Sequence, residues 1–237
     1  YAYMLADAGL VVVDIDHPKE PRITSIVELH DPHAIQVQFR YAFACDHDGV
    51  KVLDVTDLAR PRPVTTVKLE EAHSIYLART YAYVAAGKQG LVILDIEKPA
   101  EPKIDQVYNC GGRMCDVHDV KLGITYVSEF AYVADGKNGL RVLQLTSPET
   151  PGNMGFSPRP APRLIATFPI PEGGHALAVA RALDRDRAVD ESGNQIGVFG
   201  RIGARPLSLA EQQQLYLRGG RLWTVTDDPA DWRHLRK

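Results

Sequence analysis

A pattern that occurs four times constrains the fold of this chain more than any other feature. Each copy begins with an aromatic residue, passes through a glycine into an apolar run, and ends at a proline. The copies begin at Tyr1, Tyr41, Tyr81 and Phe130. Their central glycines are Gly9, Gly49, Gly90 and Gly139. A period of about forty residues is typical of repeat proteins in which each copy is one supersecondary unit.

Each copy is predicted to be β structure. The segments YAYVA from Tyr81 and LVILD from Leu91 are short and rich in aromatic and β-branched residues. Glycine-containing turns such as Gly136-Lys-Asn-Gly139 are typical of hairpins between such segments. A Pro-x-x-Pro segment follows. Proline has no N–H to donate within a sheet, so this segment is predicted to connect two strands or to lie at a sheet edge. One more apolar run and a strand opened by a histidine complete four strands per copy.

Four strands in about forty residues predict an all-β fold, a β-propeller of four-stranded blades. A β-sandwich is the alternative, but tandem units of equal strand content favour the propeller. The predicted propeller covers residues 1–206 and includes a degenerate fifth copy near Arg187. Residues 207–237 are predicted to hold a short helix from Ser208 to about Arg218, a strand and a polar tail. Because the chain opens inside the repeat, we expect it to be a piece of a longer chain.

Composition and charge exclude several classes of protein. The chain has 237 residues, of which 45% are hydrophobic and 24% charged, as in folded globular proteins. A formal net charge of −3 offers no basic surface for a nucleic acid. No apolar run approaches the about 18 residues of a membrane-spanning helix. We therefore expect neither a nucleic-acid partner nor a transmembrane segment in this chain.

Four histidines each open the last strand of a copy, and they are candidate metal ligands. They are His33, His73, His118 and His175. In a propeller this strand lies closest to the axis, so the imidazoles would approach one mouth of the central channel. Converging imidazoles could bind a transition metal. The alternative is a structural role, in which each imidazole hydrogen-bonds a loop of its own blade.

Two cysteines lie in an insertion of the third copy. Cys110 and Cys115, with His118, could be three ligands of one metal, although most zinc knuckles use a C-x-x-C spacing. A Cys110–Cys115 disulfide is expected if the protein is exported, and two unlinked thiols are the third possibility. Cys45 is expected to be a free thiol. No C-x-x-C-H motif is present, so no covalently bound c-type haem is expected.

Two groups of aspartates are assigned simpler roles. Asp14, Asp54 and Asp95 end their strands beside turns, where aspartate commonly accepts hydrogen bonds from backbone amides. Asp46 and Asp48, with His47 between them, are expected on a hairpin tip in contact with solvent, where a loosely bound cation is the alternative.

The repeated segments carry a family resemblance. LVVVD from Leu10 and LVILD from Leu91, each preceded by a glycine and followed by Pro-x-x-Pro, resemble the LVIVD repeat. The resemblance covers roughly residues 1–180. It implies a β-propeller of a secreted, periplasmic or cell-surface protein of bacteria or archaea. It implies no enzymatic activity, because the repeat is architectural. Similar domains accompany redox proteins in bacterial envelopes, which implies a multihaem c-type cytochrome as a partner.

These observations favour a non-catalytic scaffold or protein-interaction module of an exported or cell-surface protein. The competing function is a metal-dependent oxidoreductase that uses the histidines of the channel and requires a transition metal as cofactor.

Overall fold

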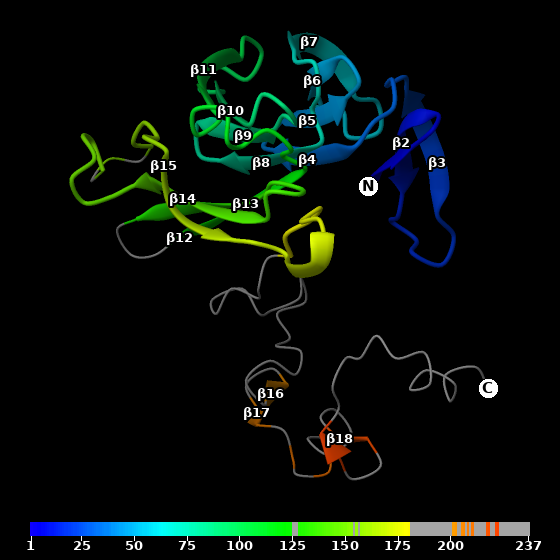
Figure 1. Ribbon diagram of the computed structural model, residues 1–237. Helices are drawn as coiled ribbons and strands as arrows, with labels where there is room; N and C mark the ends of the chain where they lie inside the picture. Colours follow the sequence, from blue (N-terminus) through cyan, green and yellow to red (C-terminus); the bar gives the residue numbers. More distant parts are fainter. Residues whose placement is uncertain are drawn as a thin grey trace. The chain divides into compact units, whose positions relative to one another are not determined.

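The computed structural model describes residues 1–124, 128–153, 155, 157–180, 201–202, 205–206, 208, 210, 217–218 and 221–222. The chain divides into two units, Tyr1–Ala180 and Arg181–Lys237. Four antiparallel sheets make up the first unit (Figure 1). In the described residues, no helix is long and apolar enough to cross a membrane.

The first sheet has three strands, and the other three have four each. The first contains β1 (Ala2–Ala6), β2 (Gly9–Asp14) and β3 (Arg22–Val27). The second contains β4 (Ala34–Gln38), β5 (Tyr41–Asp46), β6 (Gly49–Asp54) and β7 (Arg62–Lys68). The third contains β8 (Ser74–Ala78), β9 (Tyr81–Ala85), β10 (Leu91–Asp95) and β11 (Lys103–Tyr108). The fourth contains β12 (Asp119–Ile124), β13 (Glu129–Ala134), β14 (Leu140–Thr146) and β15 (Arg163–Phe168).

Each sheet is a meander whose strands follow chain order, as in a propeller blade. The strand that follows each histidine opens the next sheet, because β4 pairs with β5, β8 with β9, and β12 with β13. These opening strands also pack on one another, β4 against β8 and β8 against β12. The prediction of an all-β fold with four-stranded, blade-like sheets is confirmed. Among the described residues, no strand of the fourth sheet pairs with the first.

The hydrophobic core lies between successive sheets. Side chains alternate along a strand, so each sheet has one face toward the preceding sheet and one toward the next. In the third sheet the middle strand β10 is buried on both faces and is continuously apolar over Leu91–Leu94. Phe43 and Ile75, each 1% exposed, belong to the cluster between the second and third sheets. Burying one such side chain contributes about 1.5–3 kcal/mol.

The second unit contains two short strand pairs. β16 (Arg201–Ile202) pairs with β17 (Arg205–Pro206), and β18 (Leu217–Arg218) pairs with β19 (Arg221–Leu222). Ala210 is helical, but the predicted helix does not continue to Arg218, which lies in β18. A Gly-Gly dipeptide is a turn signal between strands as well as a helix stop, and β18 and β19 pair antiparallel here. The degenerate copy near Arg187 and the polar tail lie outside the described residues.

Candidate functional site

Three of the four repeat histidines lie next to one another where the opening strands begin. The ring centroids of His33 and His73 are 5.7 Å apart, and those of His73 and His118 are 5.2 Å apart. Each histidine is fixed by its backbone N–H, which donates 2.9 Å to a carbonyl of the neighbouring strand in its own sheet. We call His33, His73 and His118 the histidine file. The structure thus brings three predicted residues together from three different sheets.

The fourth repeat histidine does not belong to the histidine file. Val117 forms an isolated β-bridge with Gly87, and Ala176 forms the equivalent bridge with Gly136. Val117 and Ala176 therefore occupy the same position in successive copies. His118 follows Val117 by one residue, whereas His175 precedes Ala176 by one residue. His175 is therefore displaced by two positions in register, and its side chain is exposed. The sequence aligned these two histidines because each is followed by an apolar run, but the backbone pairing fixes a different register.

A carboxylate accompanies each imidazole of the histidine file, two residues earlier in the chain. The distances from Nε2 to the nearest carboxylate oxygen are 3.7 Å for His33 and Asp31, 3.9 Å for His73 and Glu71, and 3.1 Å for His118 and Asp116. All three imidazoles remain about a third exposed, at 36%, 32% and 31%. These acids were not among the predicted site residues. The shared acid-x-His spacing in the three copies could have revealed them.

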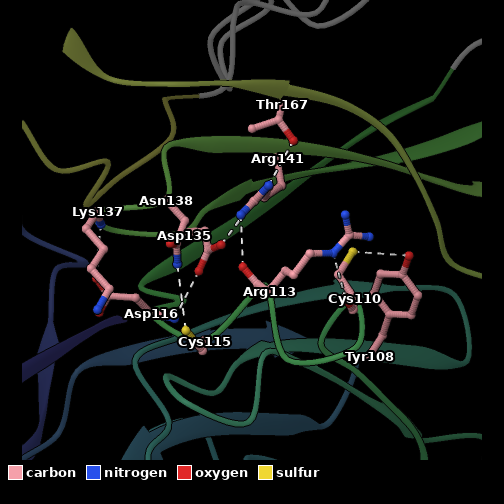
Figure 2. A network of polar contacts seen from close by, with 10 residues as sticks. All are labelled: Tyr108, Cys110, Arg113, Cys115, Asp116, Asp135, Lys137, Asn138, Arg141 and Thr167. Atoms are coloured by element: carbon pink, nitrogen blue, oxygen red, sulfur yellow. Dashed lines mark hydrogen bonds and ion pairs between the residues drawn. The ribbon is translucent and has the colours of Figure 1, made fainter.

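Backbone amides of the hairpin turns hold two of these acids in place. The Lys137 N–H donates to Asp116 Oδ2 at 3.0 Å (Figure 2). Gly136, at φ +43°, makes this approach possible, because a Cβ atom there would overlap the carboxylate. The preceding sheet has the same arrangement. Gly87 corresponds to Gly136, and the N–H of Lys88 donates to Glu71 Oε2 at 3.1 Å.

The protonation states within the site follow from these contacts. Burial lowers the pKa of His73, and the neighbouring imidazoles of His118 and His33 lower it further, against the opposing effect of Glu71. The Lys137 amide lowers the pKa of Asp116, and the hydrogen bond to His118 adds to this effect. The neutral form of His73 and the ionised form of Asp116 are therefore favoured. These forms can accept hydrogen bonds or bind a cation.

A buried ion pair supports the loop that carries Asp116. Asp135 is completely buried, and its Oδ1 accepts the Asp116 N–H at 2.9 Å. Its Oδ2 accepts a hydrogen bond from Arg141 Nε at 3.0 Å. Arg141 also donates to the Arg113 carbonyl and to Thr167 Oγ1, both at 2.9 Å (Figure 2). Asp116 is thus held through both its backbone and its side chain.

The second sheet has an equivalent ion pair. Asp46 is completely buried, which corrects the expectation that it is solvated on the hairpin tip. Its Oδ2 lies 2.6 Å from Lys51 Nζ and accepts the His30 N–H at 3.3 Å. The third sheet has Ala86 and Val92 at the corresponding positions, both completely buried. This pair of positions therefore holds either two opposite charges or two apolar side chains.

Cys110 and Cys115 are free thiols in this structure. Cys110 Sγ donates to Tyr108 Oη at 3.4 Å, and Cys115 Sγ accepts a hydrogen bond from Asn138 Nδ2 at 3.8 Å. Figure 2 shows the two sulfurs directed to these separate partners. Cys45 is also free and is completely buried, and burial raises its pKa.

Comparison with known proteins identifies the repeat. The LVIVD repeat model matches residues 1–28, 71–110 and 124–154, and no curated protein matches the chain. The matched regions include the first, third and fourth copies. The copy from Tyr41 lies outside them, yet its sheet has the same strand order as the third and fourth. The chain therefore carries LVIVD repeats, and these repeats form blade-like β-sheets.

Proposed function

We propose that this chain is a non-catalytic scaffold of the β-propeller type that docks a protein partner at the end of the sheets where the histidine file lies. The histidine file and its three acids carry the proposal. They lie where three sheets begin and are partly exposed, and backbone hydrogen bonds fix the three histidines, Glu71 and Asp116. A rigid polar surface of this kind suits docking, because little side-chain or loop ordering opposes association.

The charge of this surface indicates what kind of partner it fits. Asp31, Glu71 and Asp116 place three carboxylates beside imidazoles, of which His73 favours its neutral form. An acidic surface accelerates association with a partner that has a basic rim. We propose an exported or cell-surface location and an electron-transfer protein, specifically a multihaem c-type cytochrome, as the partner. The family resemblance supports this choice.

Binding of a purified multihaem c-type cytochrome tests the docking function. We expect affinity that falls with rising salt and falls at least tenfold in the triple variant Asp31→Asn, Glu71→Gln, Asp116→Asn. The matched control is Glu20→Gln, Glu97→Gln, Glu101→Gln. It removes the same charge from exposed connections at the opposite ends of the strands. Equal weakening by both triple variants would refute docking at the histidine file, and an absence of binding would refute the cytochrome as the partner.

A metal-dependent oxidoreductase is the second candidate, and the contact between the three imidazole rings favours it. This function requires stoichiometric metal and electron transfer to an artificial acceptor, with both lost in His73→Ala. A protein that binds metal but passes no electrons would contradict the oxidoreductase and leave the docking function in place.

A further inference from the structure

We propose that the histidine file is a binding site for one divalent transition-metal ion, with His73, His118 and Asp116 as its protein ligands. This inference goes beyond the docking function and does not depend on it. The three ligands come from the loops that precede β8 and β12, so the ion would connect the third and fourth sheets.

The spacing of the two rings fits a shared ion. Metal–nitrogen bonds of zinc are about 2.0–2.1 Å, so two imidazoles on one tetrahedral ion have ring centroids about 5 Å apart. The centroids of His73 and His118 are 5.2 Å apart. Those of His33 and His73 are 5.7 Å apart, which makes His33 the more distant donor. The rings of His73 and His118 thus already lie at about the separation that a shared ion requires.

The carboxylate of Asp116 is the third donor. Two ligand atoms on one tetrahedral ion are about 3.3 Å apart for bonds of about 2 Å. Asp116 Oδ1 and His118 Nε2 are 3.1 Å apart and share a hydrogen bond, so a bound ion would take the place of the proton between them and release it. The other oxygen, Oδ2, accepts the Lys137 N–H, so this hydrogen bond orients the carboxylate and leaves Oδ1 toward the imidazole. Glu71 is less suitable as a metal ligand, because Lys88 Nζ lies 3.8 Å from its Oε1 and would compete with the ion for this carboxylate.

A rotation of His73 completes the site. In the described residues, no three His, Cys, Asp or Glu side chains already enclose a position for an ion. The rings of His73 and His118 are stacked at 26°, so the His73 ring has to turn until a nitrogen is directed toward the ion. Its side chain is 32% exposed, which leaves space for this movement. Water would occupy the fourth position, as in open zinc sites with three protein ligands.

The donor set selects the class of metal. Two imidazoles and one carboxylate suit Zn²⁺, Cu²⁺ or Ni²⁺, whereas Mg²⁺ and Ca²⁺ prefer oxygen ligands alone. Cys115 is adjacent to Asp116 in the chain, but its sulfur contacts Asn138, so it is not among the donors. The acids Asp31 and Glu71 add negative charge beside a dication without being ligands.

Zinc titration of the metal-free full chain tests the proposal by isothermal calorimetry. We expect one Zn²⁺ per chain and no comparable binding of Mg²⁺. His73→Ala and His118→Ala should each weaken the affinity about 100-fold or more, and Asp116→Asn about tenfold. His17→Ala is the matched control. His17 is an exposed histidine on the connection from β2 to β3, at the opposite ends of the strands, and its removal should leave the affinity unchanged.

Two results would overturn the proposal. One is zinc affinity that His73→Ala leaves intact or that His17→Ala reduces equally. The other is a spectroscopic result on the protein without substitutions, which does not depend on the folding of a variant. Bound Cu²⁺ should show coupling to imidazole nitrogens in its electron paramagnetic resonance spectrum, and a spectrum with oxygen ligands alone would exclude His73 and His118. Circular dichroism of each variant in chelator confirms that its sheets are retained.

Discussion

Glu129 is a buried carboxylate whose charge is poorly compensated. Its side chain is 5% exposed, Arg79 Nη1 lies 3.5 Å from Oε1, and this oxygen accepts no hydrogen bond. Burial raises the pKa of Glu129, and the charge of Arg79 only partly opposes this effect. A raised folded-state pKa means that the folded state binds the proton more tightly than the unfolded state. The stability contributed by that proton is present at acidic pH and lost as pH rises through the folded pKa.

The substitution Glu129→Gln should therefore stabilise the protein at neutral pH. We expect the free energy of unfolding at pH 7 to increase by about 1 kcal/mol, because a neutral amide replaces a buried charge. Arg79 is 33% exposed and can be solvated after the change. At pH 4 the gain should vanish, because the carboxyl is then protonated. Urea unfolding at both pH values measures this, and a loss of stability at pH 7 would show that the ion pair outweighs the cost of burial.

Gly136 allows the hairpin turn to approach Asp116. A Cβ at this position, with φ +43°, would overlap the Asp116 carboxylate, whereas at Gly111, with φ +66°, it would meet no atom within 4 Å. Gly111→Ala should cost about 1 kcal/mol for backbone strain alone. Gly136→Ala should cost clearly more and displace the carboxylate from His118. Equal losses in urea unfolding would contradict the proposed fit between turn and carboxylate.

The sequence predicts contacts between residues that are close along the chain. Asp14, Asp54 and Asp95 were expected to fix turns, and each accepts the N–H of the residue two positions later, at 2.8–2.9 Å. The local spacing alone determines such a bond. The contact between His73 and His118 depends instead on how two sheets pack, and the burial of Asp46 depends on Lys51 across a hairpin. Neither follows from local spacing.

At the scale of elements, the repeat in the sequence and the sheet in space differ by one strand. Each copy ends with the strand that opens the next sheet, since Ala34 pairs with Cys45 of the following copy. Strand and turn signals are local and could be predicted. Which sheet the strand after a histidine joins depends on its pairing with the following copy, and local sequence signals do not determine that pairing. The same offset recurs after His33, His73 and His118, so each of these histidines precedes the first strand of a sheet.

The hairpins of the second and third sheets offer a comparison of charged and apolar pairs. Removing one member of a buried ion pair leaves the other charge without compensation, so Asp46→Ala should cost about 3 kcal/mol. The double variant Asp46→Ala, Lys51→Val reproduces the Ala86 and Val92 of the third sheet. It should recover at least half of that loss, because two apolar side chains replace both charges. Chemical denaturation of the single and double variants measures the recovery, and equal instability of the two would contradict it.

At the scale of the first unit, apolar clusters between neighbouring sheets hold the four sheets together, and polar contacts such as Ser74 with Asp119 add to them. Leu10 and Ala42 belong to the cluster of the first two sheets, Phe43 and Ile75 to that of the second and third, and a further cluster joins the third and fourth. In repeat architectures of this kind, stability is approximately a sum of repeat and interface terms. The second sheet takes part in two of these interfaces, so its opening should require that both be lost.

Thiol labelling measures whether the second sheet opens by itself. Cys45 is completely buried in β5, and burial raises its pKa, so its thiolate is both inaccessible and disfavoured in the folded state. Cys115 is only partly buried, and a thiol reagent should modify it first. Cys45 should react at the rate of global unfolding, because two interfaces have to separate before the reagent reaches it. Mass spectrometry assigns each modified residue, and Cys45→Ala is the control for the slow phase. Modification of Cys45 well before global unfolding would show that the second sheet opens independently of its neighbours.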